Sequence, residues 1–534
     1  MRVTQASSGN SLGSLRLKQP NIVLAGPPGS GKSTVGRLLS QRLHREFVDI
    51  DTVVEEIGGK SIESIFAEDG EAVFRQLETD ACLRLAEPAD RVIACGGGAL
   101  MNESNRALLE GGGYLVCLTG EPGTLMQRIG SNGRRPLIAG ENPEQQLELL
   151  LSERQATYDS IPVQVDTTSL TAQQVTDSVA SYPFARRIHR MVASHPRPGY
   201  DVVVGHDLLS SLATYLEQAN LSPPYLLVSD TNVGPLFEEQ IRSALDCSFV
   251  MLPAGEVNKS QETISSLYSA LIESGLDRNG TVLAIGGGVL LDLAGFAAAT
   301  YMRGISWAAL PTSLLAVVDA SLGGKVGFNL SAGKNLVGAF HAPRLVLADL
   351  AALASLPHGE IKTGLAEIVK AALIGDPELY ARMESGPGWI SQDWIQRAIR
   401  IKLGIVDEDP QEHGRRAALN LGHTFAHALE VSSGYSLTHG QAVSIGLLAA
   451  ARLADAMGRC EADLPARVEH VLSRFALPTT YPDLDTDPVL EAMTRDKKGR
   501  AGRVRFVLPI RPGKVEFGIE SPENLVRQVL EGLK

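Results

Sequence analysis

The stretch Gly26-Pro-Pro-Gly-Ser-Gly-Lys-Ser33 decides the fold of the first part of the chain. It is a complete GxxxxGK(S/T) motif that directly follows the apolar run Asn21–Ala25 and precedes a helical pattern at residues 32–43. A strand, a Gly-rich turn and a helix in this order form the context that a phosphate-binding loop requires. The sequence therefore predicts a nucleotide site at the start of an α/β domain.

The residues of this loop indicate how a nucleotide would bind. Backbone N–H groups from Gly29 to Lys32 can surround a β-phosphate at the positive end of the helix. Lys32 would bridge the β- and γ-phosphates, and the Ser33 hydroxyl would ligate Mg²⁺. A Gly-rich turn with an exposed lysine is the purely structural alternative. The nucleotide-binding residues predicted here are Gly29, Ser30, Gly31, Lys32, Ser33 and Thr34.

The pattern of strands and helices divides the chain into four parts. Strand–helix alternation predicts a parallel α/β P-loop domain over residues 20–181. Residues 182–199, rich in Pro, Arg and His, are interpreted as a linker. Alternation resumes over residues 200–350, which predicts an α/β Rossmann-like domain, and residues 351–534 are mostly helical apart from a strand-like stretch at 504–508. In the first domain, strand-like runs follow residue 25 at 92–94, 114–118 and 163–165.

Composition narrows the class of protein. The 534 residues are 44% hydrophobic and 21% charged, which is ordinary for a globular chain. A net charge of −12 argues against bulk binding to nucleic acid or anionic membrane. The five cysteines are far apart and form no CxxC pair, which is typical of a reducing compartment, and no uncharged apolar run reaches membrane-spanning length. We therefore expect a soluble, cytoplasmic protein with no nucleic-acid or membrane partner.

Further motifs in the first domain indicate what accepts the phosphate. They are Phe47-Val-Asp-Ile-Asp51, Phe74-Arg-Gln-Leu-Glu78, Gly96-Gly-Gly98, Arg135-Pro-Leu137 and Arg154 before Tyr158. In this order and spacing, residues 20–180 closely resemble shikimate kinase. A related nucleoside or gluconate kinase is the alternative for this half of the chain.

The resemblance implies a role for each matching residue. Asp51, Arg75, the backbone of Gly97 and Gly98, and Arg154 would hold shikimate. Arginines suit a carboxylate through bidentate pairing, and Asp51 can deprotonate the reacting hydroxyl. Asp49 would lie near Mg²⁺ and Arg128 near the adenine. Arg135, from a mobile lid, would act with Lys32 to neutralise charge on the transferring phosphoryl group.

A second nucleotide signature lies in the Rossmann-like part. The turn Ile285-Gly-Gly-Gly-Val289 follows a strand and has Asp292 three residues on, so its backbone can approach a pyrophosphate. Asp230 and Asn232 follow an earlier strand, where they could contact a ribose, and Glu256 and Lys259 lie in another loop. A glycine turn needed only for chain reversal is the alternative.

The helical part contains a candidate metal site. His423 and His427 are four residues apart and therefore share a helix face, His439 begins another helical run, and Glu367 lies in Gly364-Leu-Ala-Glu-Ile-Val-Lys370. Two histidines and a carboxylate with one open position form a catalytic zinc pattern. From spacing alone, His423 and His427 would both be ligands, and a packed or capping histidine pair is the structural alternative.

Residues 190–534 resemble 3-dehydroquinate synthase. The matching stretches are GGGVLLDLAGF, Tyr301-Met-Arg-Gly304, Pro311-Thr-Ser313, Val318-Asp319, Gly323-Gly-Lys325, residues 333–340, GLAEIVK, LNLGHTFAHALE and Thr438-His-Gly440. The resemblance implies that the metal ligands are Glu367, His423 and His439. His427 would instead transfer a proton and contact the substrate phosphate.

The same resemblance implies a pocket of cations for an acidic, phosphorylated substrate. Its members are Arg303, Lys325, Lys334, Asn335, Lys370, Lys402, Arg416, Asn420, His427 and Lys497 or Lys498. Asp319 would hold a substrate hydroxyl, and Lys325, Glu412 and Asp319 would act in catalysis. The NAD contacts would be Asp230, Asn232, Glu256, Lys259, Gly287, Gly288, Val289, Asp292, Thr312 and Ser313.

Taken together, these resemblances predict a bifunctional enzyme of aromatic amino-acid biosynthesis. One half would use ATP–Mg²⁺ to phosphorylate shikimate, and the other would use NAD and Zn²⁺ or Co²⁺ to convert 3-deoxy-arabino-heptulosonate 7-phosphate to 3-dehydroquinate and phosphate. The synthase part would form a homodimer. Rival hypotheses are a polyol dehydrogenase, an inactive kinase module fused to a synthase, and a non-catalytic scaffold.

Overall fold

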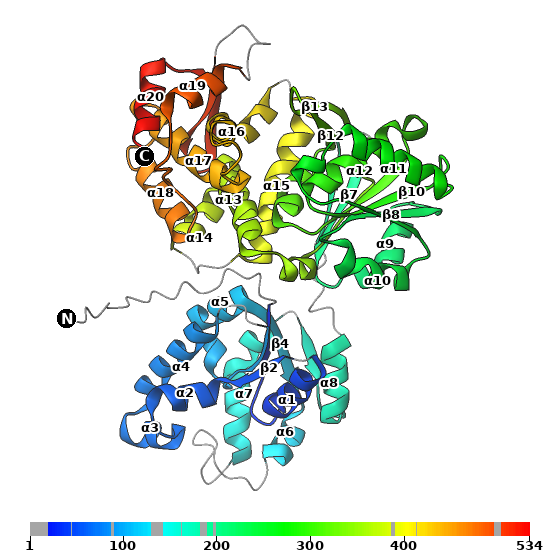
Figure 1. The fold of residues 1–534 in the computed structure, drawn as a ribbon. Coiled ribbons are helices and arrows are strands. Elements are labelled where there is room, and N and C mark those ends of the chain that lie inside the picture. Colours follow the sequence, from blue (N-terminus) through cyan, green and yellow to red (C-terminus); the bar gives the residue numbers. More distant parts are fainter. Residues whose placement is uncertain are drawn as a thin grey trace, which may run out of the picture. The chain divides into compact units, whose positions relative to one another are not determined.

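The computed structural model describes residues 20–43, 45–86, 90–129, 143–161, 163–181, 189–195, 199–385, 390–412, 414–495 and 504–534. These residues belong to two compact units, an N-terminal unit within residues 18–187 and a C-terminal unit within residues 188–534. Figure 1 shows strands and flanking helices in both units. Arg135, Lys497 and Lys498 lie outside the described residues.

The N-terminal unit is a five-stranded parallel sheet in the order β2-β3-β1-β4-β5. Its strands are β1 (Asn21–Ala25), β2 (Glu46–Asp49), β3 (Arg91–Ala94), β4 (Gly113–Thr119) and β5 (Gln164–Asp166). Its helices are α1 (Lys32–Leu43), α2 (Ile50–Gly58), α3 (Ile62–Glu68), α4 (Glu71–Leu85), α5 (Glu103–Gly112), α6 (Pro122–Ile129), α7 (Pro143–Asp159) and α8 (Ala172–Ser181).

Helices cover both faces of this sheet because the strands are apolar on both sides. Ile22 and Leu24 of β1 pack with α1 and α8, whereas Val23 and Ala25 belong to a separate core that includes residues of α2, α4 and α5. Near-continuous apolar strands are typical of parallel sheets with two covered faces. The carboxyl ends of β1, β2 and β3 therefore meet at one edge, where the phosphate-binding loop lies.

The C-terminal unit opens with a seven-stranded sheet in the order β6-β7-β14-β11-β10-β8-β9. Its strands are β6 (His189–Ala193), β7 (Tyr200–Gly205), β8 (Tyr225–Asp230), β9 (Ser248–Leu252), β10 (Thr281–Gly286), β11 (Ser306–Pro311) and β14 (Leu345–Asp349). Its helices are α9 (Leu212–Gln218), α10 (Gly234–Ala244), α11 (Gln261–Glu273) and α12 (Gly288–Thr300). All pairs are parallel except β6 with β7.

The strand β6 corrects part of the linker interpretation. His189–Ala193 pairs antiparallel with β7 across five residues, so this part of the stretch 182–199 is an edge strand of the sheet. Its alternation of half-buried and exposed residues ends in buried Ala193, which packs in the core. A short edge strand with one buried face gives only a weak apolar–polar alternation in the sequence. The Pro, Arg and His residues around it favoured the interpretation as a linker.

The rest of the C-terminal unit is mostly helical, as predicted. The helices are α13 (His358–Gly375), α14 (Pro377–Ser385), α15 (Gln392–Glu408), α16 (His423–Ser432), α17 (His439–Ala456), α18 (Leu464–Arg474), α19 (Thr486–Arg495) and α20 (Glu523–Glu531). Two antiparallel hairpins accompany them, β12 (Lys325–Leu330) with β13 (Gly333–Phe340) and β15 (Arg505–Arg511) with β16 (Lys514–Glu520). The sequence indicated β15 and missed β16.

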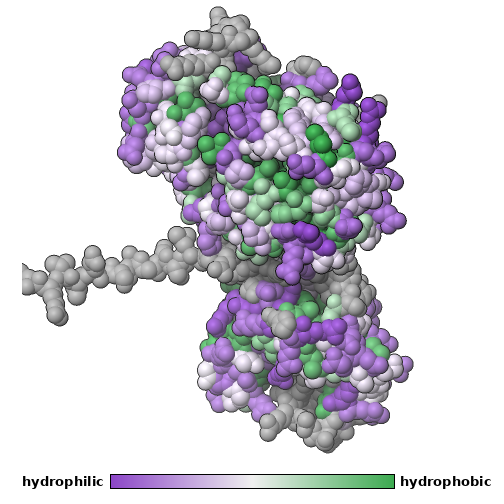
Figure 2. All heavy atoms as spheres, turned by 45° about the vertical axis from the view of Figure 1, so that its right-hand side comes forward, coloured by the Kyte–Doolittle hydropathy of each residue, from purple (hydrophilic) through white to green (hydrophobic). Residues whose placement is uncertain are grey.

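One continuous core joins the sheet to the helices of this unit. It contains Val202 and Ala284 on one sheet face, most of α12, and buried residues of α13 and α17. The largest fully buried side chains include Trp307, Tyr380, Phe425 and Phe475. Figure 2 shows hydrophilic side chains over much of the visible surface, with small groups of hydrophobic ones between them. No described helix is both long and apolar enough to span a membrane.

Candidate active sites

The phosphate-binding loop lines a cavity of about 490 Å³ in the N-terminal unit. Gly26, Gly29 and Gly31 have φ of 132°, 80° and 89°, a region that favours glycine and lets the loop turn sharply between β1 and α1. The Lys32 Nζ donates to the carbonyl oxygens of Gly26 and Pro27 at 2.8 and 2.9 Å. The ammonium is thus held over the loop that would surround a phosphate.

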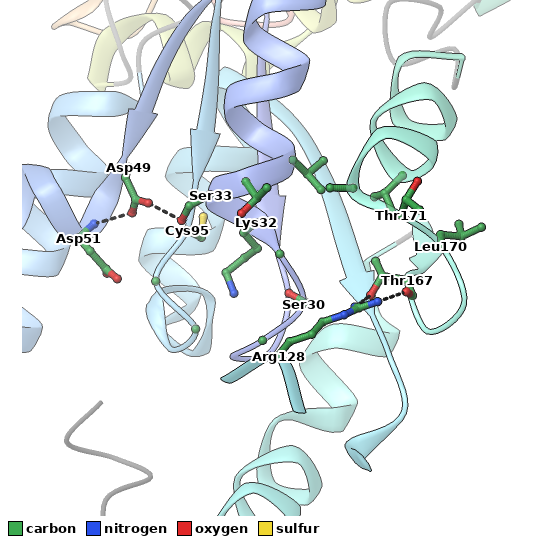
Figure 3. A pocket seen from close by; sticks show the side chains of 18 residues that line it. Ser30, Lys32, Ser33, Asp49, Asp51, Cys95, Arg128, Thr167, Leu170 and Thr171 are labelled. Carbon is green, nitrogen blue, oxygen red and sulfur yellow. Dashed lines mark hydrogen bonds between the residues drawn. The ribbon is translucent and has the colours of Figure 1, made fainter. Parts of the chain in front are cut away.

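Two acidic residues, Asp49 at the end of β2 and Asp51 in the first turn of α2, lie on one side of this lysine (Figure 3). The Ser33 hydroxyl donates to Asp49 Oδ2 at 2.7 Å, and Asp49 Oδ1 accepts from the Asp51 N–H at 3.2 Å, which caps α2. Asp51 also lines the cavity. A hydroxyl and a carboxylate in contact are oxygen ligands that suit Mg²⁺, so these residues fit the metal expected here.

Arg128 lies on the other side of Lys32 and lines the same cavity. Its guanidinium donates to Thr167 Oγ1 at 2.8 Å and to the Thr167 carbonyl at 2.6 Å. The flat side chain is therefore held by the loop after β5, along with Leu170 and Thr171 of the lining. Sequence analysis missed Thr167, which belongs to no motif.

The loop after β3 lies beside the two arginines that are expected to bind an acidic phosphoryl acceptor. Arg154 Nη1 and the Tyr158 hydroxyl both donate to the Gly97 carbonyl, at 2.6 and 2.7 Å. A Cβ added at Gly98 would lie 2.7 Å from Arg75 Nη1, so the absence of a side chain lets that guanidinium approach. The structure thus places Arg75 of α4 and Arg154 of α7 beside the same glycine loop.

Glu78 is a site residue to which sequence analysis gave no role. It is only 2% exposed, and its Oε2 accepts from Arg75 Nη1 at 2.9 Å. Burial raises the pKa of the Glu78 carboxyl, and the neighbouring Arg75 partly opposes that shift. The carboxylate fixes the direction of the guanidinium. The available signal was the spacing of three residues, which places both side chains on one face of α4.

In the C-terminal unit, the Gly-rich turn lies between β10 and α12. The helix begins at Gly288 with Gly287 as its N-cap, no side chain caps the first turn, and Val289 lies in that turn. The backbone N–H groups there remain available to an anion. Asp230 ends β8, the neighbour of β10, and its Oδ1 accepts from the N–H groups of Asn232 and Val233. These residues fit a dinucleotide.

A buried lysine connects the nucleotide region to the β12–β13 hairpin. The Lys259 Nζ contacts Asp292 Oδ2 at 2.5 Å and Asn335 Oδ1 at 2.6 Å. Glu256 Oε1 accepts from Asn329 Nδ2 at 2.8 Å in the same hairpin. Asn335, expected among the substrate contacts, thus bonds to a residue expected at NAD. On the other side of the turn, the Thr312 N–H bonds to the Gly286 carbonyl, and Ser313 Oγ accepts from Ala316 N–H.

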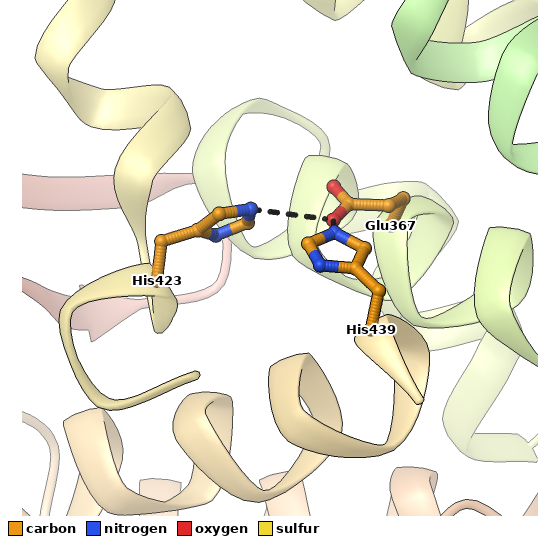
Figure 4. Close-up of side chains that lie close together, drawn as sticks. All are labelled: Glu367, His423 and His439. Carbon is orange, nitrogen blue, oxygen red and sulfur yellow. Dashed lines mark ion pairs between the residues drawn. The ribbon is translucent and has the colours of Figure 1, made fainter. Parts of the chain in front are cut away.

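Glu367, His423 and His439 lie together, with one possible ligand atom from each within 4.8 Å of the others. Glu367 Oε1 is 3.5 Å from His423 Nε2 and 3.4 Å from His439 Nε2. Figure 4 shows both rings turned toward the carboxylate from different helices. His427 lies next to this group, its ring centroid 5.4 Å from that of His423, but it is not part of the triad.

Small residues at helix crossings bring the three side chains together. A Cβ at Gly440 would lie 2.3 Å from the Thr363 Cα, so α17 can approach α13 only because this position is glycine. A Cβ at Gly446 would lie 2.3 Å from the Gly422 carbonyl oxygen, which fixes α17 against the start of α16. His423 and His439 each begin their helix, so these crossings place them opposite Glu367.

The chemistry of the triad fits a divalent cation. Glu367 is 3% exposed, and neither of its oxygens has a hydrogen-bond partner among the described residues, although Lys370 pairs with it. Burial would raise the pKa of this carboxyl, but Lys370, with His439 adding to its effect, outweighs burial and holds the pKa well below its usual range. Burial lowers the pKa of His423 to about 3, so its imidazole is neutral and able to bind a metal.

The pKa of His439 shifts in the opposite direction to that of His423. Burial would lower its pKa, but Glu367 and Glu430 outweigh burial and raise the pKa to about 10. Glu430 Oε1 lies 3.6 Å from His439 Nδ1. His439 would lose this proton when a divalent cation binds to its ring nitrogen. Two nitrogens and one oxygen with an open side form the donor set of a catalytic zinc site.

Buried cations and carboxylates surround the triad. The Lys402 Nζ bonds to the Asp319 carbonyl and to Asp319 Oδ1, both at 2.6 Å, and Asp319 lies in a π-helical turn at Ala316–Ala320. Burial lowers the pKa of Lys402, with Lys370 and Arg416 adding to the shift. Burial also lowers the pKa of Arg416. An anion entering this site would replace part of the lost hydration of these cations.

The other expected members of this pocket lie at its edge or apart from it. Lys325 pairs with Glu412 Oε2 at 2.5 Å, and Asn420 donates to Glu412 Oε1 at 3.3 Å. Lys334 lies 4.0 Å from Glu430. Within the described part of the chain, Arg303 forms no hydrogen bond or ion pair with these groups, and its φ of 69° is left-handed. Glu430, like Thr167 and Glu78, was not identified from the sequence.

Comparison with protein-family models gives three matches. Residues 28–182 match the model "Shikimate kinase", residues 249–363 match "3-dehydroquinate synthase N-terminal", and residues 364–499 match "3-dehydroquinate synthase C-terminal". The matches cover the predicted fusion of the two enzyme families.

Known proteins resemble the synthase region along nearly their whole length. A 3-dehydroquinate synthase of Dehalococcoides mccartyi is 40% identical over 347 residues, which are 63% of this chain and 97% of that protein. The synthase of Symbiobacterium thermophilum is 42% identical over 350 residues, 63% of this chain and 98% of that protein. Among solved structures, the 2-epi-5-epi-valiolone synthase of Streptomyces hygroscopicus, with NAD⁺ and Zn²⁺ bound, is 31% identical with a TM-score of 0.58 and covers 64% of this chain and 99% of that chain.

Proposed function

The chain belongs to the 3-dehydroquinate synthase family and carries a shikimate kinase domain at residues 28–182, and from this premise we propose which residues perform the two reactions. The protein is a bifunctional enzyme, a transferase and a lyase. It phosphorylates shikimate with ATP, and it cyclises 3-deoxy-arabino-heptulosonate 7-phosphate to 3-dehydroquinate with release of phosphate.

In the kinase site, Asp51 is the proposed base for the shikimate hydroxyl. It lines the cavity that also contains Lys32, and its position is fixed by the hydrogen bond from its N–H to Asp49. Arg75 and Arg154, both held at the Gly96–Gly98 loop, are proposed to bind the shikimate carboxylate by charge-assisted hydrogen bonds. Arg135, outside the described residues, is proposed to act with Lys32 on the transferring phosphoryl group.

Ser33 and Asp49 are the proposed Mg²⁺ ligands of this site. Their contact at 2.7 Å supports the assignment, because it places two oxygen ligands side by side, as one cation requires. The ATP contacts proposed are the loop residues Gly29 to Thr34, with Arg128 beside the adenine. The hydrogen bonds of Arg128 to Thr167 support that position, since they hold the guanidinium plane at the cavity wall.

In the synthase site, Glu367, His423 and His439 are proposed to hold Zn²⁺ or Co²⁺, and the β10–α12 turn is proposed to hold NAD. When bound, the metal supplies a Lewis acid, and NAD⁺ supplies a reversible hydride acceptor. Asp230, Asn232, Glu256, Lys259, Gly287, Gly288, Val289, Asp292, Thr312 and Ser313 are the proposed NAD contacts. The convergence of a buried carboxylate and two half-buried imidazoles is the observation that carries the metal assignment.

The buried cations are proposed to orient the acidic substrate. Lys370, Lys402 and Arg416 are each 9% exposed or less. Asp319 forms a hydrogen bond with Lys402, and its carboxylate can also accept a hydrogen bond from a substrate hydroxyl. His427, beside the triad, is proposed to move a proton at the phosphate end. Lys325 forms an ion pair with Glu412 that an incoming carboxylate or phosphate can replace, so Lys325 is proposed to contact substrate and, with Glu412, to act in catalysis.

One assay tests these assignments together. Purified full-length protein is supplied with the heptulosonate phosphate and, separately, with ATP and shikimate, and phosphate and ADP are measured. Asp51→Asn should remove only ADP formation, and Asp319→Asn should remove only phosphate release. If Asp51→Asn kept full kinase activity in a folded protein, another group would be the base.

Assembly and location are further proposals. We expect a homodimer through the C-terminal unit, by analogy with the synthase family, and size-exclusion chromatography with light scattering would measure it. We place the protein in the cytoplasm, which is supported by five cysteines that are all free. Fractionation of the source cell would test that location.

A further inference from the structure

Glu430 lies between the proposed metal site and the β12–β13 hairpin. It is on α16, one residue before the penultimate position of that helix, and it is 7% exposed. Its Oε1 is 3.6 Å from Nδ1 of His439 and 4.0 Å from Nζ of Lys334. One buried carboxylate therefore contacts a proposed metal ligand and a lysine that the resemblance to the synthase family assigns to the substrate pocket.

The turn that follows Glu430 brings an aromatic ring to the same lysine. The Glu430 carbonyl accepts from the N–H of Tyr435 at 2.8 Å and from the Ser433 hydroxyl at 3.1 Å, which closes the turn after α16. Tyr435 has a φ of 63°, and the Lys334 Nζ lies 4.2 Å from the centroid of its ring. The carboxylate and the aromatic face thus both contact one ammonium group.

The two histidines of the triad have the same arrangement of ring nitrogens. In His423, Nδ1 lies 3.1 Å from the Leu421 carbonyl oxygen, and Nε2 points to Glu367. In His439, Nδ1 faces Glu430, and Nε2 points to Glu367. An oxygen acceptor at Nδ1 favours the tautomer whose Nε2 lone pair is available to a metal. Glu430 therefore does for His439 what a backbone carbonyl does for His423.

We propose that Glu430 is a positioning residue that fixes the orientation and tautomer of His439 for metal binding and links this ligand to Lys334. The proposal rests on the metal triad proposed above and adds a residue outside it. Because one carboxylate serves both partners, loss of its charge should weaken metal binding and disturb substrate binding together. A residue that only neutralised Lys334 would alter substrate binding alone.

The experiment measures metal binding directly on the full-length protein. Glu430→Gln keeps the size and an acceptor oxygen but removes the charge, and Glu430→Ala removes both. Glu469→Gln, a surface carboxylate on α18 paired with Arg452, is the matched control. The zinc dissociation constant is obtained by competition with a chromophoric chelator, and the visible absorption of the Co²⁺ form reports the ligand geometry.

We expect zinc to bind about 10-fold more weakly in Glu430→Gln and up to about 100-fold more weakly in Glu430→Ala, as for other groups that orient metal-binding histidines. The Co²⁺ spectrum should change in both variants, and KM for the heptulosonate phosphate should rise. Glu469→Gln should match the wild type in all three measurements. Circular dichroism and thermal unfolding identify a variant that is merely misfolded. If Glu430→Ala is misfolded, the zinc affinity of the isosteric Glu430→Gln variant decides whether Glu430 positions His439.

Two outcomes separate failure of this inference from failure of the metal site itself. If the wild type binds zinc and both Glu430 variants bind it equally tightly, Glu430 does not position His439 and the inference is wrong, whatever happens to KM. If the wild type binds no zinc, or if His439→Ala binds zinc as tightly as the wild type, the triad is wrong and the inference falls with it.

Discussion

Replacing Lys32 with methionine should abolish the kinase reaction and leave the synthase reaction intact. The expectation follows from the position of Lys32 in the cavity of the N-terminal unit, whereas the metal triad belongs to the C-terminal unit. Methionine keeps an unbranched chain of similar length and removes the charge. The change therefore probes electrostatics at the phosphate with little change in packing.

The size of both effects can be worked out from the contacts of Lys32. Its Nζ donates to two carbonyl oxygens of the loop, at 2.8 and 2.9 Å. An acceptor left without a partner costs about 1–3 kcal/mol, and water entering the cavity should keep the loss near the lower value. In the reaction, losing one positioned donor at a site of developing charge reduces kcat by about 10²–10³-fold.

The assay follows both reactions in the same preparation. ADP formation with shikimate is coupled to NADH oxidation, and phosphate release from the heptulosonate phosphate is measured separately. Lys60→Met is the control, because Lys60 pairs with Glu68 and Asp69 outside the cavity lining. If Lys32→Met lowered both activities equally while unfolding at the wild-type temperature, the two sites would not work independently and the reasoning would be refuted.

Three further predictions address the other features. His439→Ala should lose most of its zinc, whereas His427→Ala should keep about one zinc per chain and lose turnover, as measured by metal analysis; the reverse result would identify His427 as the ligand. Gly98→Ala should raise KM for shikimate roughly tenfold, because its Cβ would lie 2.7 Å from Arg75 Nη1 and displace a charged hydrogen-bond donor. Initial-rate measurements would give this KM. An unchanged KM would show that Arg75 does not bind shikimate. The Cys95 thiol, whose pKa is raised well above its ordinary value by burial, should react with iodoacetamide at pH 8 far more slowly in the native protein than in urea, and equal rates would contradict its burial.

Sequence predicted the fold class and the kinase loop well because both depend on local patterns. The expected fold of a P-loop domain, a Rossmann-like domain and a helical region is confirmed, as are the two activities. Helix α1 covers residues 32–43 as predicted, because the loop motif sets both the turn and the start of the helix. The assigned roles of single residues stay predictions, since the structure shows only where those residues lie.

The sequence spacing of the histidines is not enough to identify the metal ligands. Two histidines four residues apart share a helix face, so spacing alone favoured His423 with His427. The structure instead directs His423 Nε2 and His439 Nε2 at Glu367, across three helices. No local pattern encodes that crossing, and only resemblance to the synthase family pointed to His439. Glu430 was missed for the same reason.

Weak or composite patterns explain the differences in secondary structure. The strand β6 has five residues within a Pro- and Arg-rich stretch, so its single inward face did not appear as a strand. The apolar residues Val515, Phe517 and Ile519 alternate in the sequence of β16, but a register shift opposite Phe506 and Val507 places Phe517 and Ile519 on different faces, and Phe517 is exposed. The β12–β13 hairpin was hidden because its residues were interpreted only as parts of substrate motifs.

The two sites therefore depend on the fold in different ways. The kinase site is built from one contiguous loop and the neighbouring ends of parallel strands, so its geometry follows from the sheet. The synthase metal site depends on two crossings that admit no methyl group, at Gly440 against Thr363 and at Gly446 against Gly422. Because His439 begins α17, any shift of that helix moves a proposed ligand directly. Helix packing beside the ligands, at Gly440 next to His439 and at Gly422 next to His423, thus controls the metal geometry in one unit, whereas the loop sequence controls phosphate binding in the other.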